Sequence, residues 1–420
     1  MNIVYEEGIE LTSLFIKAGE NATDPFLKMN IRTCIEEFDI GSYRVKTYGI
    51  PAFEKGDYAE ANNEIGFIVG GSSNCNDTGI KLFNKKVETS FNFSRNVLDL
   101  LISAQLPNVT VAVDGTGDYR SIVEAVGVIP NNSDTFFYIH IKAGFNYENV
   151  HIGPEKRKIV MSGDGIGKTN VVSSLSNSSG FGIGESAALN IKSNYFLAKD
   201  MSIINNAGPN AGQAVALSTY GDYIACYRCS IEGYQDTLYT AHGANQFFSY
   251  CNIYGTVDFI FGDAAVVIQN SYISVRLPSG GQTVVTADGR IDAKLNTAIV
   301  IHNCSISPTP ELQRNPNVKT YLGRPRKKFS LMVVMQSYLD AFIDPQGWLK
   351  FDSSSDLASL YYAEYGNSGN GSFTSGRVNR PGYHILNNPD DVQSFTVEKF
   401  INGSEWLPIL GVPFIPDLIR

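Results

Sequence analysis

The sequence of 420 residues is poor in charged side chains, which make up 18% of it, and its 33 basic and 42 acidic residues give a net charge of −9. A chain this acidic lacks the basic patch that binding to nucleic acid requires. It also lacks any run of about 18 apolar residues, which excludes a membrane-spanning helix. Its hydrophobic content of 43% excludes a disordered chain, and its length is sufficient for a large core.

Cysteine is sparse as well, with six residues at Cys34, Cys75, Cys226, Cys229, Cys251 and Cys304. The count alone allows many pairings and gives no connectivity. No His or Cys set beside the Cys226–Cys229 pair resembles a zinc site, so two strand cysteines are the simpler interpretation. The first 20 residues carry acidic side chains where a signal peptide has its apolar segment, so we expect no signal peptide there.

The N-terminal quarter of the chain has helical periodicity. Apolar residues recur at helical intervals over residues 81–101, and residues 25–50 and 53–61 show a similar pattern. We therefore expect a small α-helical bundle over residues 1–104, followed by a second domain over residues 105–420.

The periodicity changes at Val109, where short Val- and Ile-rich runs begin to alternate with Gly, Asn, Ser and Asp turns, as in strands. A four-residue unit ending in isoleucine recurs at Ile203, Ile231, Ile253, Ile273 and Ile306. The steps of 28, 22, 20 and 33 residues indicate a solenoid, and the shorter steps leave no room for a helix. The pattern predicts a mainly β protein, a parallel β-helix, with an ordinary β-sandwich as the alternative.

Polar residues recur at the same interval. Gln213 and Gln235 are 22 residues apart, and so are Asp236 and Asp258. If one coil has this length, each pair lies on one face of adjacent coils, about 4.8 Å apart. Ionising both carboxyl groups at this distance is unfavourable, so the pKa of one should rise. The ionised group can then serve as nucleophile and the protonated group as acid. The glutamine amides offer N–H donors for an oxyanion.

Two further features follow from the spacing and the motifs. Arg324, in the sequence YLGRP, is a candidate to hold one carboxylate ionised through two hydrogen bonds. Cys229 and Cys251 are also 22 residues apart, which predicts neighbours close enough for a disulfide. Each of these residues alone could equally occupy a solvated turn or have a structural role in a strand. The matched 22-residue spacing is what favours a catalytic role.

Seven motifs of residues 109–420 resemble a plant pectin methylesterase. They are DGTGDY (114–119), GQAVAL (212–217), GYQDTLY (233–239), YGTVDFIFG (254–262), TYLGRP (320–325), DPQGWL (344–349) and RPGYH (380–384). QDTLY and GTVDFIFG together are highly specific. The resemblance implies a right-handed parallel β-helix, in agreement with the repeat. The preceding residues resemble a shortened pectin methylesterase inhibitor-like pro-region, in which Cys34 and Cys75 correspond to a disulfide, whereas Cys304 has no partner.

The family's roles carry over to matching residues of this chain. Asp258 would attack the methyl-ester carbonyl, and Asp236 would protonate the departing methanol and then activate water. Gln213 and Gln235 would stabilise the oxyanion, and Arg324 would bind substrate and fix Asp258. No metal or other cofactor is needed for such an acyl transfer. The implied substrate-binding residues are Arg324, Arg326, Tyr234 and Phe259.

Two positions depart from the family pattern. Arg326 stands where the family usually has a tryptophan that lines the sugar subsite, and Arg380 stands where another tryptophan commonly precedes PGYH. We therefore expect the catalytic groups to be complete and the binding groove to be altered.

The resemblance implies hydrolysis of methylated homogalacturonan (pectin) to pectate and methanol, in modification of the plant cell wall. It implies a secreted monomer with an incomplete N-terminus here, and a proteinaceous pectinesterase inhibitor as a candidate partner. A catalytically impaired pectin-binding β-helix protein is the alternative, favoured by the lost groove aromatics and the missing signal peptide. A lyase or polygalacturonase is disfavoured because the motifs lack the acidic clusters that those enzymes need.

Overall fold

The computed structural model describes residues 46–47, 107–241, 245–352 and 357–419. The chain divides into two compact units, one of residues 1–106 with 405–413 and the other of residues 107–404 with 414–420. The helical bundle expected over residues 1–104 and the pair Cys34–Cys75 lie outside the described residues, apart from residues 46–47.

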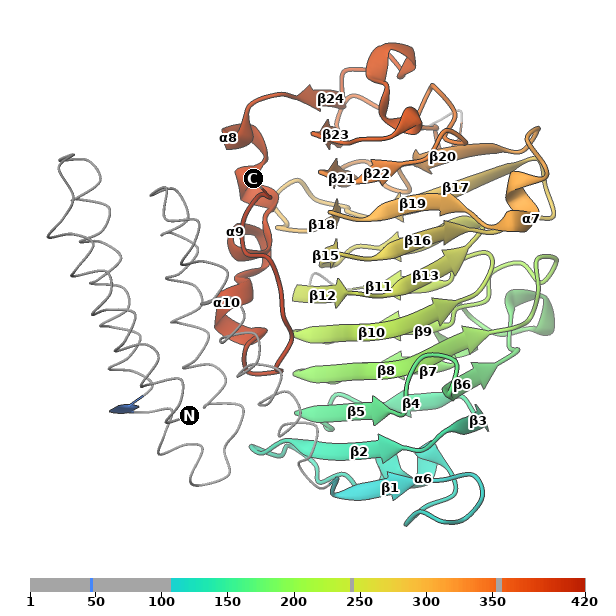
Figure 1. The fold of residues 1–420 in the computed structure, drawn as a ribbon, viewed down its shortest axis with the longest axis vertical. Coiled ribbons are helices and arrows are strands. Elements are labelled where there is room, and N and C mark those ends of the chain that lie inside the picture. Colours follow the sequence, from blue (N-terminus) through green and yellow to red (C-terminus); the bar gives the residue numbers. More distant parts are fainter. Residues whose placement is uncertain (1–45, 48–106, 242–244, 353–356, 420) are drawn as a thin grey trace, which may run out of the picture. The chain divides into compact units, whose positions relative to one another are not determined.

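Parallel strands wind through the second unit in stacked coils (Figure 1). In the described part of the chain they form a sheet of seven strands and a sheet of 17 strands. The central coils contribute strands to both sheets, and strands at the same position in successive coils pair in parallel register. This is the parallel β-helix that the repeat predicts, and the β-sandwich alternative is wrong.

The seven-stranded sheet contains β4 (Val150–Ile152), β7 (Leu189–Ile191), β9 (Leu217–Thr219), β11 (Leu238–Thr240), β14 (Val257–Gly262), β17 (Gln282–Asp288) and β20 (Lys319–Gly323). The larger sheet contains β1 (Val109–Val111), β2 (Phe137–Ile141), β3 (Gly144–Tyr147), β5 (Ile159–Gly163), β6 (Thr169–Ser173), β8 (Phe196–Asn205), β10 (Ile224–Glu232), β12 (Asn245–Ser249), β13 (Asn252–Gly255), β15 (Ala265–Gln269), β16 (Tyr272–Val275), β18 (Ala298–His302), β19 (Ser305–Pro308), β21 (Leu331–Met335), β22 (Tyr338–Leu339), β23 (Tyr361–Tyr365) and β24 (Tyr383–Leu386). The described helices are α6 (Ile122–Gly127), α7 (Pro310–Gln313), α8 (Pro389–Val392), α9 (Val397–Ile401) and α10 (Gly403–Trp406).

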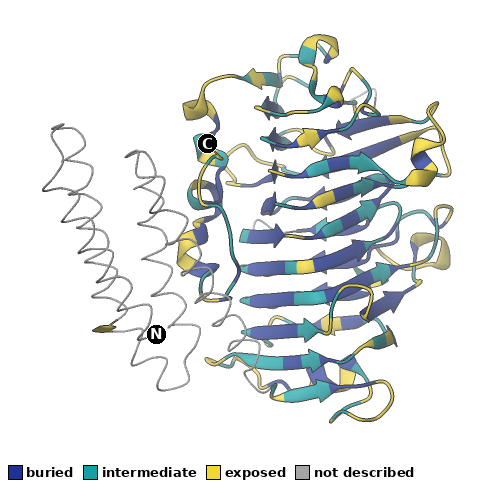
Figure 2. Ribbon diagram, in the orientation of Figure 1, coloured by how far each residue is buried: buried dark blue, intermediate teal, exposed yellow. Residues whose placement is uncertain are grey.

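The isoleucine repeat is a ladder inside the β-helix. The five isoleucines pair in register in successive coils and are fully buried. Figure 2 shows in dark blue the buried residues along the stacked strands. The residue three positions before each isoleucine has a left-handed backbone, with φ between 51° and 58°, at Asp200, Arg228, Tyr250, Asn270 and Asn303. A single left-handed residue turns the strand, so the repeated tetrad marks the corner of each coil.

Helix α6 packs against β1 and β4, next to the first coils. Ser121 caps it by accepting a hydrogen bond from the Glu124 amide, and the Glu124 side chain accepts one from the Ser121 amide in return. The helix buries Ile122, Ala125 and Val126 in the core. A solenoid needs such a cover where its stacking ends, because the terminal coil otherwise exposes apolar side chains.

Cys229 and Cys251 occupy equivalent positions in adjacent coils, as predicted, because the following residues Ser230 and Asn252 pair in register. The predicted disulfide is wrong, since both thiols are free and fully buried. Each thiol donates to a backbone carbonyl instead, with Sγ–O distances of 3.4 Å to Ala198 and to Cys226. Stacked side chains lie parallel at about 4.8 Å, whereas a disulfide needs Cβ atoms near 3.8 Å.

Cys304 is also a free, buried thiol.

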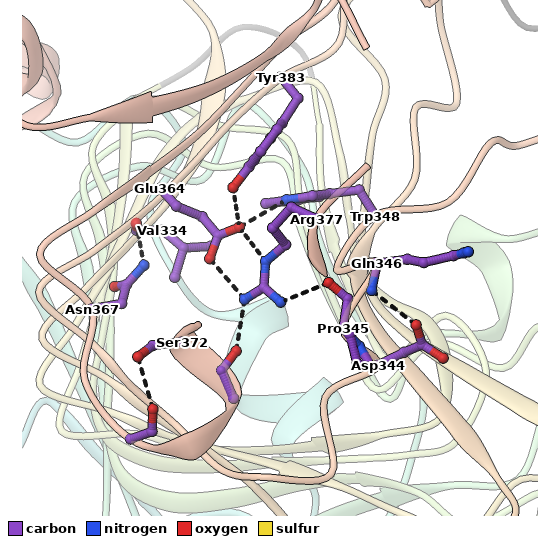
Figure 3. Close-up of polar contacts among 12 residues, drawn as sticks. Val334, Asp344, Pro345, Gln346, Trp348, Glu364, Asn367, Ser372, Arg377 and Tyr383 are labelled. Atoms are coloured by element: carbon purple, nitrogen blue, oxygen red, sulfur yellow. Dashed lines mark hydrogen bonds and ion pairs between the residues drawn. The ribbon is translucent and has the colours of Figure 1, made fainter. Parts of the chain in front are cut away.

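A buried ion pair organises the last coils. Glu364 of β23 accepts two hydrogen bonds from Arg377, at 2.8 and 3.0 Å, and both side chains are only 2% exposed. Trp348 and Tyr383 also donate to Glu364, so the carboxylate is the centre of the network in Figure 3. Arg377 in turn donates to the Pro345 carbonyl.

The network fixes the segment that extends the seven-stranded sheet beyond β20. Leu322 and Leu349 join the segment 344–349 to β20 through backbone hydrogen bonds to Gly347 and Gly323. The C-terminal coils are thereby attached to the strand that leads directly into Arg324.

We expect Arg377→Met to lower the free energy of unfolding by roughly 3–5 kcal/mol, because it leaves the Glu364 carboxylate buried without its partner. Urea unfolding followed by circular dichroism would measure this loss. Arg314→Met is the matched control, because Arg314 pairs with Glu311 at the surface, where both side chains are more than 60% exposed. Equal unfolding midpoints for both variants would contradict the prediction.

Candidate active site

The two aspartates predicted from the 22-residue spacing lie at equivalent positions of adjacent coils. Leu238 of β11 pairs with Ile260 of β14, and the Asp236 amide donates to the Val257 carbonyl at 3.0 Å. Asp236 and Asp258 are 5% and 8% exposed. Both have left-handed backbones, with φ of 61° and 49°. A non-glycine residue held in this region is strained, and such residues concentrate at functional sites.

Arg324 forms a bidentate ion pair with Asp258. Its Nε and Nη2 atoms donate to Asp258 Oδ1 and Oδ2 at 2.8 and 2.6 Å. The two side chains are only 18% and 11% exposed, which shields the pair from solvent. The Arg324 guanidinium also lies 4.7 Å from the ring centre of Phe351. The two hydrogen bonds fix both oxygens of the Asp258 carboxylate.

Asp236 has the opposite electrostatic environment. Burial raises its pKa, and the negative charge of Asp258 raises it further, to about 8. The positive charges of Arg326 and Arg324 lower the pKa but do not offset the burial. At neutral pH the pair therefore holds one proton on Asp236, while Asp258 is paired with arginine.

Gln213 and Gln235 lie beside these carboxyls in neighbouring coils. The Ala214 amide donates to the Gln235 carbonyl at 3.1 Å, and the Asn177 amide donates to the Gln213 carbonyl at 2.8 Å. Both side chains are partly exposed, and their amide groups have no hydrogen-bond partner among the described residues. Two backbone-anchored residues thus present unused N–H donors at the surface next to the aspartates.

An aromatic row borders the carboxyls on the outer face of the seven-stranded sheet. The rings of Tyr239 and Phe261 stack at 4.6 Å with an interplanar angle of 4°. Tyr220 meets Tyr239 edge-on at 5.4 Å. The Arg326 guanidinium lies 5.8 Å from the centre of the Phe261 ring, at the other end of the row. Tyr239 is partly exposed, whereas Phe261 is only 1% exposed, so of these two rings only Tyr239 can meet the apolar face of a sugar.

Sequence reasoning missed Tyr239 as a site residue and Phe261 as the buried ring on which it stacks, although a signal was present. Each lies three residues after a candidate aspartate, so the two aromatic positions repeat at the same 22-residue interval.

The structure does not support the prediction that Phe259 binds substrate, because its side chain is fully buried in the core. The left-handed Asp258 interrupts the strand alternation, and the register with β17 shifts between Val257 and Ile260. As a result Phe259 and Ile260 both face inward, and Phe261 takes the outer position.

The other predicted binding residues lie near the carboxyls. Arg326 is exposed, and its charge acts on Asp236. Tyr234 is partly buried next to Gln235, and the Arg276 guanidinium lies 5.2 Å from its ring centre. Arg276 also lies 5.0 Å from the ring of Tyr254, so Tyr234 is held by a cation between two rings.

Within the described ranges, no group of three or more His, Cys, Asp or Glu side chains is arranged to hold a metal ion. The described helices include none that is long and apolar enough to cross a membrane.

Comparison with known proteins agrees with this geometry. The sequence profile of the family described as Pectinesterase matches residues 108–404. The chain belongs to the pectinesterase family. The solved pectin methylesterase from carrot is 44% identical, with a TM-score of 0.73, and the match covers 74% of this chain and 98% of the carrot chain. A pectin methylesterase from Aspergillus niger has a TM-score of 0.62 at 27% identity, covering 71% of this chain and 95% of its own.

Relatives known by sequence give the same result for this pectinesterase-family chain. Pectinesterase 2 of Citrus sinensis is 45% identical over 320 residues, which is 76% of this chain. A pectinesterase/pectinesterase inhibitor of Arabidopsis thaliana is 43% identical over 340 residues, or 80% of this chain. The chain spans 62% of the Citrus protein and 71% of the Arabidopsis protein.

We expect Arg326→Gln to raise the pKa of Asp236 above its wild-type value of about 8, because the Arg326 charge lowers that pKa. The carbonyl stretch of the protonated carboxyl group, measured by infrared difference spectroscopy against Asp236→Asn, reports the titration. Arg228→Gln removes an arginine bound to Asp200 in the other sheet and should leave the titration unchanged. A carboxyl that titrates near its ordinary value of 3.8 would contradict the assignment.

Proposed function

We propose that this chain hydrolyses the methyl esters of polygalacturonate, or pectin, to pectate and methanol, with residues 105–420 as the catalytic domain. One observation carries the proposal. Asp258 is paired with Arg324 through two hydrogen bonds, while burial and the adjacent charge raise the pKa of Asp236 to about 8. A paired nucleophile and a protonated acid are thus available together at neutral pH.

In the first step, an Asp258 oxygen attacks the ester carbonyl carbon and forms a tetrahedral intermediate. The N–H groups of Gln213 and Gln235 stabilise its oxyanion. The bond to the methoxy oxygen then breaks, and Asp236 gives its proton to that oxygen, so methanol leaves. The product is an acyl-enzyme, in which the galacturonate carbonyl is joined to Asp258 as an anhydride.

In the second step, the ionised Asp236 takes a proton from water, and the resulting hydroxide attacks the galacturonate carbonyl. The anhydride bond breaks, which releases the galacturonate carboxyl group and restores the Asp258 carboxylate. Asp236 is protonated again at the end of the cycle. Arg324 orients Asp258 in both steps, because its fork leaves the carboxylate little rotational freedom.

We further propose that the chain acts as a secreted monomer on the plant cell wall. On this proposal, residues 1–104 are a shortened inhibitor-like pro-region, and a proteinaceous pectinesterase inhibitor is a partner. The names of plant relatives that combine pectinesterase with pectinesterase inhibitor support this organisation.

Methanol release from methylated pectin by the purified chain tests the proposal. We expect Asp258→Asn to lower kcat by about 10⁴-fold or more, because the nucleophile is lost. Asp200→Asn is a matched control. Asp200 resembles Asp258 because it also accepts two hydrogen bonds from an arginine, Arg228, at 2.7 and 2.8 Å, and also has a left-handed backbone. Asp200 lies in the 17-stranded sheet, away from the candidate site.

Methanol release that Asp200→Asn retains and Asp258→Asn loses is the expected result. Activity unaffected by Asp258→Asn would overturn the proposed mechanism. If the wild-type chain binds pectin without releasing methanol, the alternative of a catalytically impaired pectin-binding protein is correct.

Arg326 should make activity dependent on salt and on the free carboxylates of partly de-esterified pectin, because it places an exposed cation beside the aromatic row. We expect Arg326→Trp to raise activity on highly methylated pectin and to flatten the salt dependence. Initial rates on pectins of graded methylation at several salt concentrations measure both effects. If neither quantity changes, Arg326 does not line the groove.

A further inference from the structure

Asp288 is a buried carboxyl group that the proposed mechanism does not use. It ends β17, beside Gly262 of β14, and is fully buried. Its Oδ1 accepts hydrogen bonds from the Arg290 and Leu331 amides, at 3.1 and 2.8 Å. Its backbone carbonyl accepts two more, from the Arg326 amide at 3.0 Å and the Ser330 hydroxyl at 2.7 Å.

Three of these four donors belong to the loop of residues 324–331, which carries Arg324 and Arg326. The same segment also makes backbone hydrogen bonds in which the Arg324 amide donates to Thr286, the Phe329 amide to Arg290 and the Tyr361 amide to Ser330. Asp288 therefore makes most of the polar contacts between this loop and the strand beneath it. A shift of the loop would move Arg324, and with it the carboxylate of Asp258 that Arg324 grips.

The surroundings of Asp288 favour a neutral carboxylic acid. Its Oδ2 atom is buried without a hydrogen-bond partner, and among the described residues no cationic side chain forms an ion pair with it. Burial has the largest effect on the pKa of Asp288 and raises it, while the Leu331 and Arg290 amides and the Arg290 charge lower it and the Asp263 charge raises it. The buried Tyr362 side chain of β23 also interacts electrostatically with Asp288. An ionised carboxylate would leave a charge unpaired here, which is costly.

We propose that Asp288 is a positioning residue for the Arg324–Arg326 loop and that it holds this loop as a protonated acid. The inference rests on the proposed function, because its effect on rate passes through Arg324 and Asp258. Burial raises the pKa of Asp288 to about 7. Above that pH the charged group needs water or new donors, so the loop loosens and Arg324 no longer fixes the nucleophile.

The first test compares Asp288→Asn with Asp288→Ala by the pH dependence of kcat. Asparagine keeps the acceptor for the Arg290 and Leu331 amides but cannot ionise, whereas alanine removes it. We expect Asp288→Ala to lose about 10-fold to 10²-fold in kcat throughout, because a displaced catalytic group is costly. We expect Asp288→Asn to recover the rate and to move the high-pH fall upward by about one unit, since Asp236, with a pKa of about 8, then limits it alone. Asp292 is an exposed aspartate in the loop that follows β17, and Asp292→Asn should match the wild type.

A high-pH fall that is the same in Asp288→Asn and the wild type would overturn the protonated state. An Asp288→Asn variant as slow as Asp288→Ala at pH 6 would show that the charged form is needed. An Asp288→Ala variant with wild-type kcat would remove the positioning role.

A second test needs no activity and so separates this inference from the proposed function. The folded-state pKa of about 7 lies above the ordinary value of 3.8, so ionisation destabilises the folded wild type as pH rises between these values. We expect the melting temperature of Asp288→Asn minus that of the wild type to be near zero at pH 4, to grow up to pH 7 and then to level off. A difference that does not vary with pH would contradict a raised pKa, whatever the chain catalyses.

Discussion

In-register stacking of parallel coils is the constraint on which the rest of the structure depends. Each coil repeats the backbone path of the one before, so side chains at equivalent positions lie one above another at about 4.8 Å. Inside, this produces the ladder of isoleucines from Ile203 to Ile306. Outside, the same rule brings Asp236 next to Asp258 and Tyr239 next to Phe261. The same coil repeat therefore positions the side chains of both the core and the candidate site.

Stacking also affects the electrostatics of the site, because it places the two carboxyl groups close together while Arg324 forms its ion pair with Asp258. Arg324 arrives from β20, two strands beyond Asp258, and binds that carboxylate with both nitrogens of its fork. Asp236 is left buried beside a negative charge, which raises its pKa. In the proposed mechanism, the division between nucleophile and acid thus results from which of the two carboxyls Arg324 binds.

Residues that follow the coil repeat could be placed from the sequence, whereas residues at irregularities of the repeat could not. Equal spacings were sufficient to place Asp236 beside Asp258, and Cys229 beside Cys251, in neighbouring coils. They could not show that the left-handed Asp258 turns Phe259 inward, because that depends on a local shift in strand register. Nor could they show that stacked thiols lie too far apart and too parallel to bond. The buried acid Asp288 has no spacing signal, because its role depends on a loop more than 30 residues away.

The contrast between two aspartate–arginine pairs shows what the site adds to the repeat. Asp200 and Asp258 share a left-handed backbone and a forked arginine partner. The Arg228–Asp200 pair is 50% and 25% exposed, whereas the Arg324–Asp258 pair is 18% and 11% exposed and lies beside a second carboxyl. Solvent weakens the more exposed Arg228–Asp200 pair. The proposed reaction therefore requires burial and a protonated neighbour in addition to the paired arginine, and in the described structure the seven-stranded sheet provides both at Asp258.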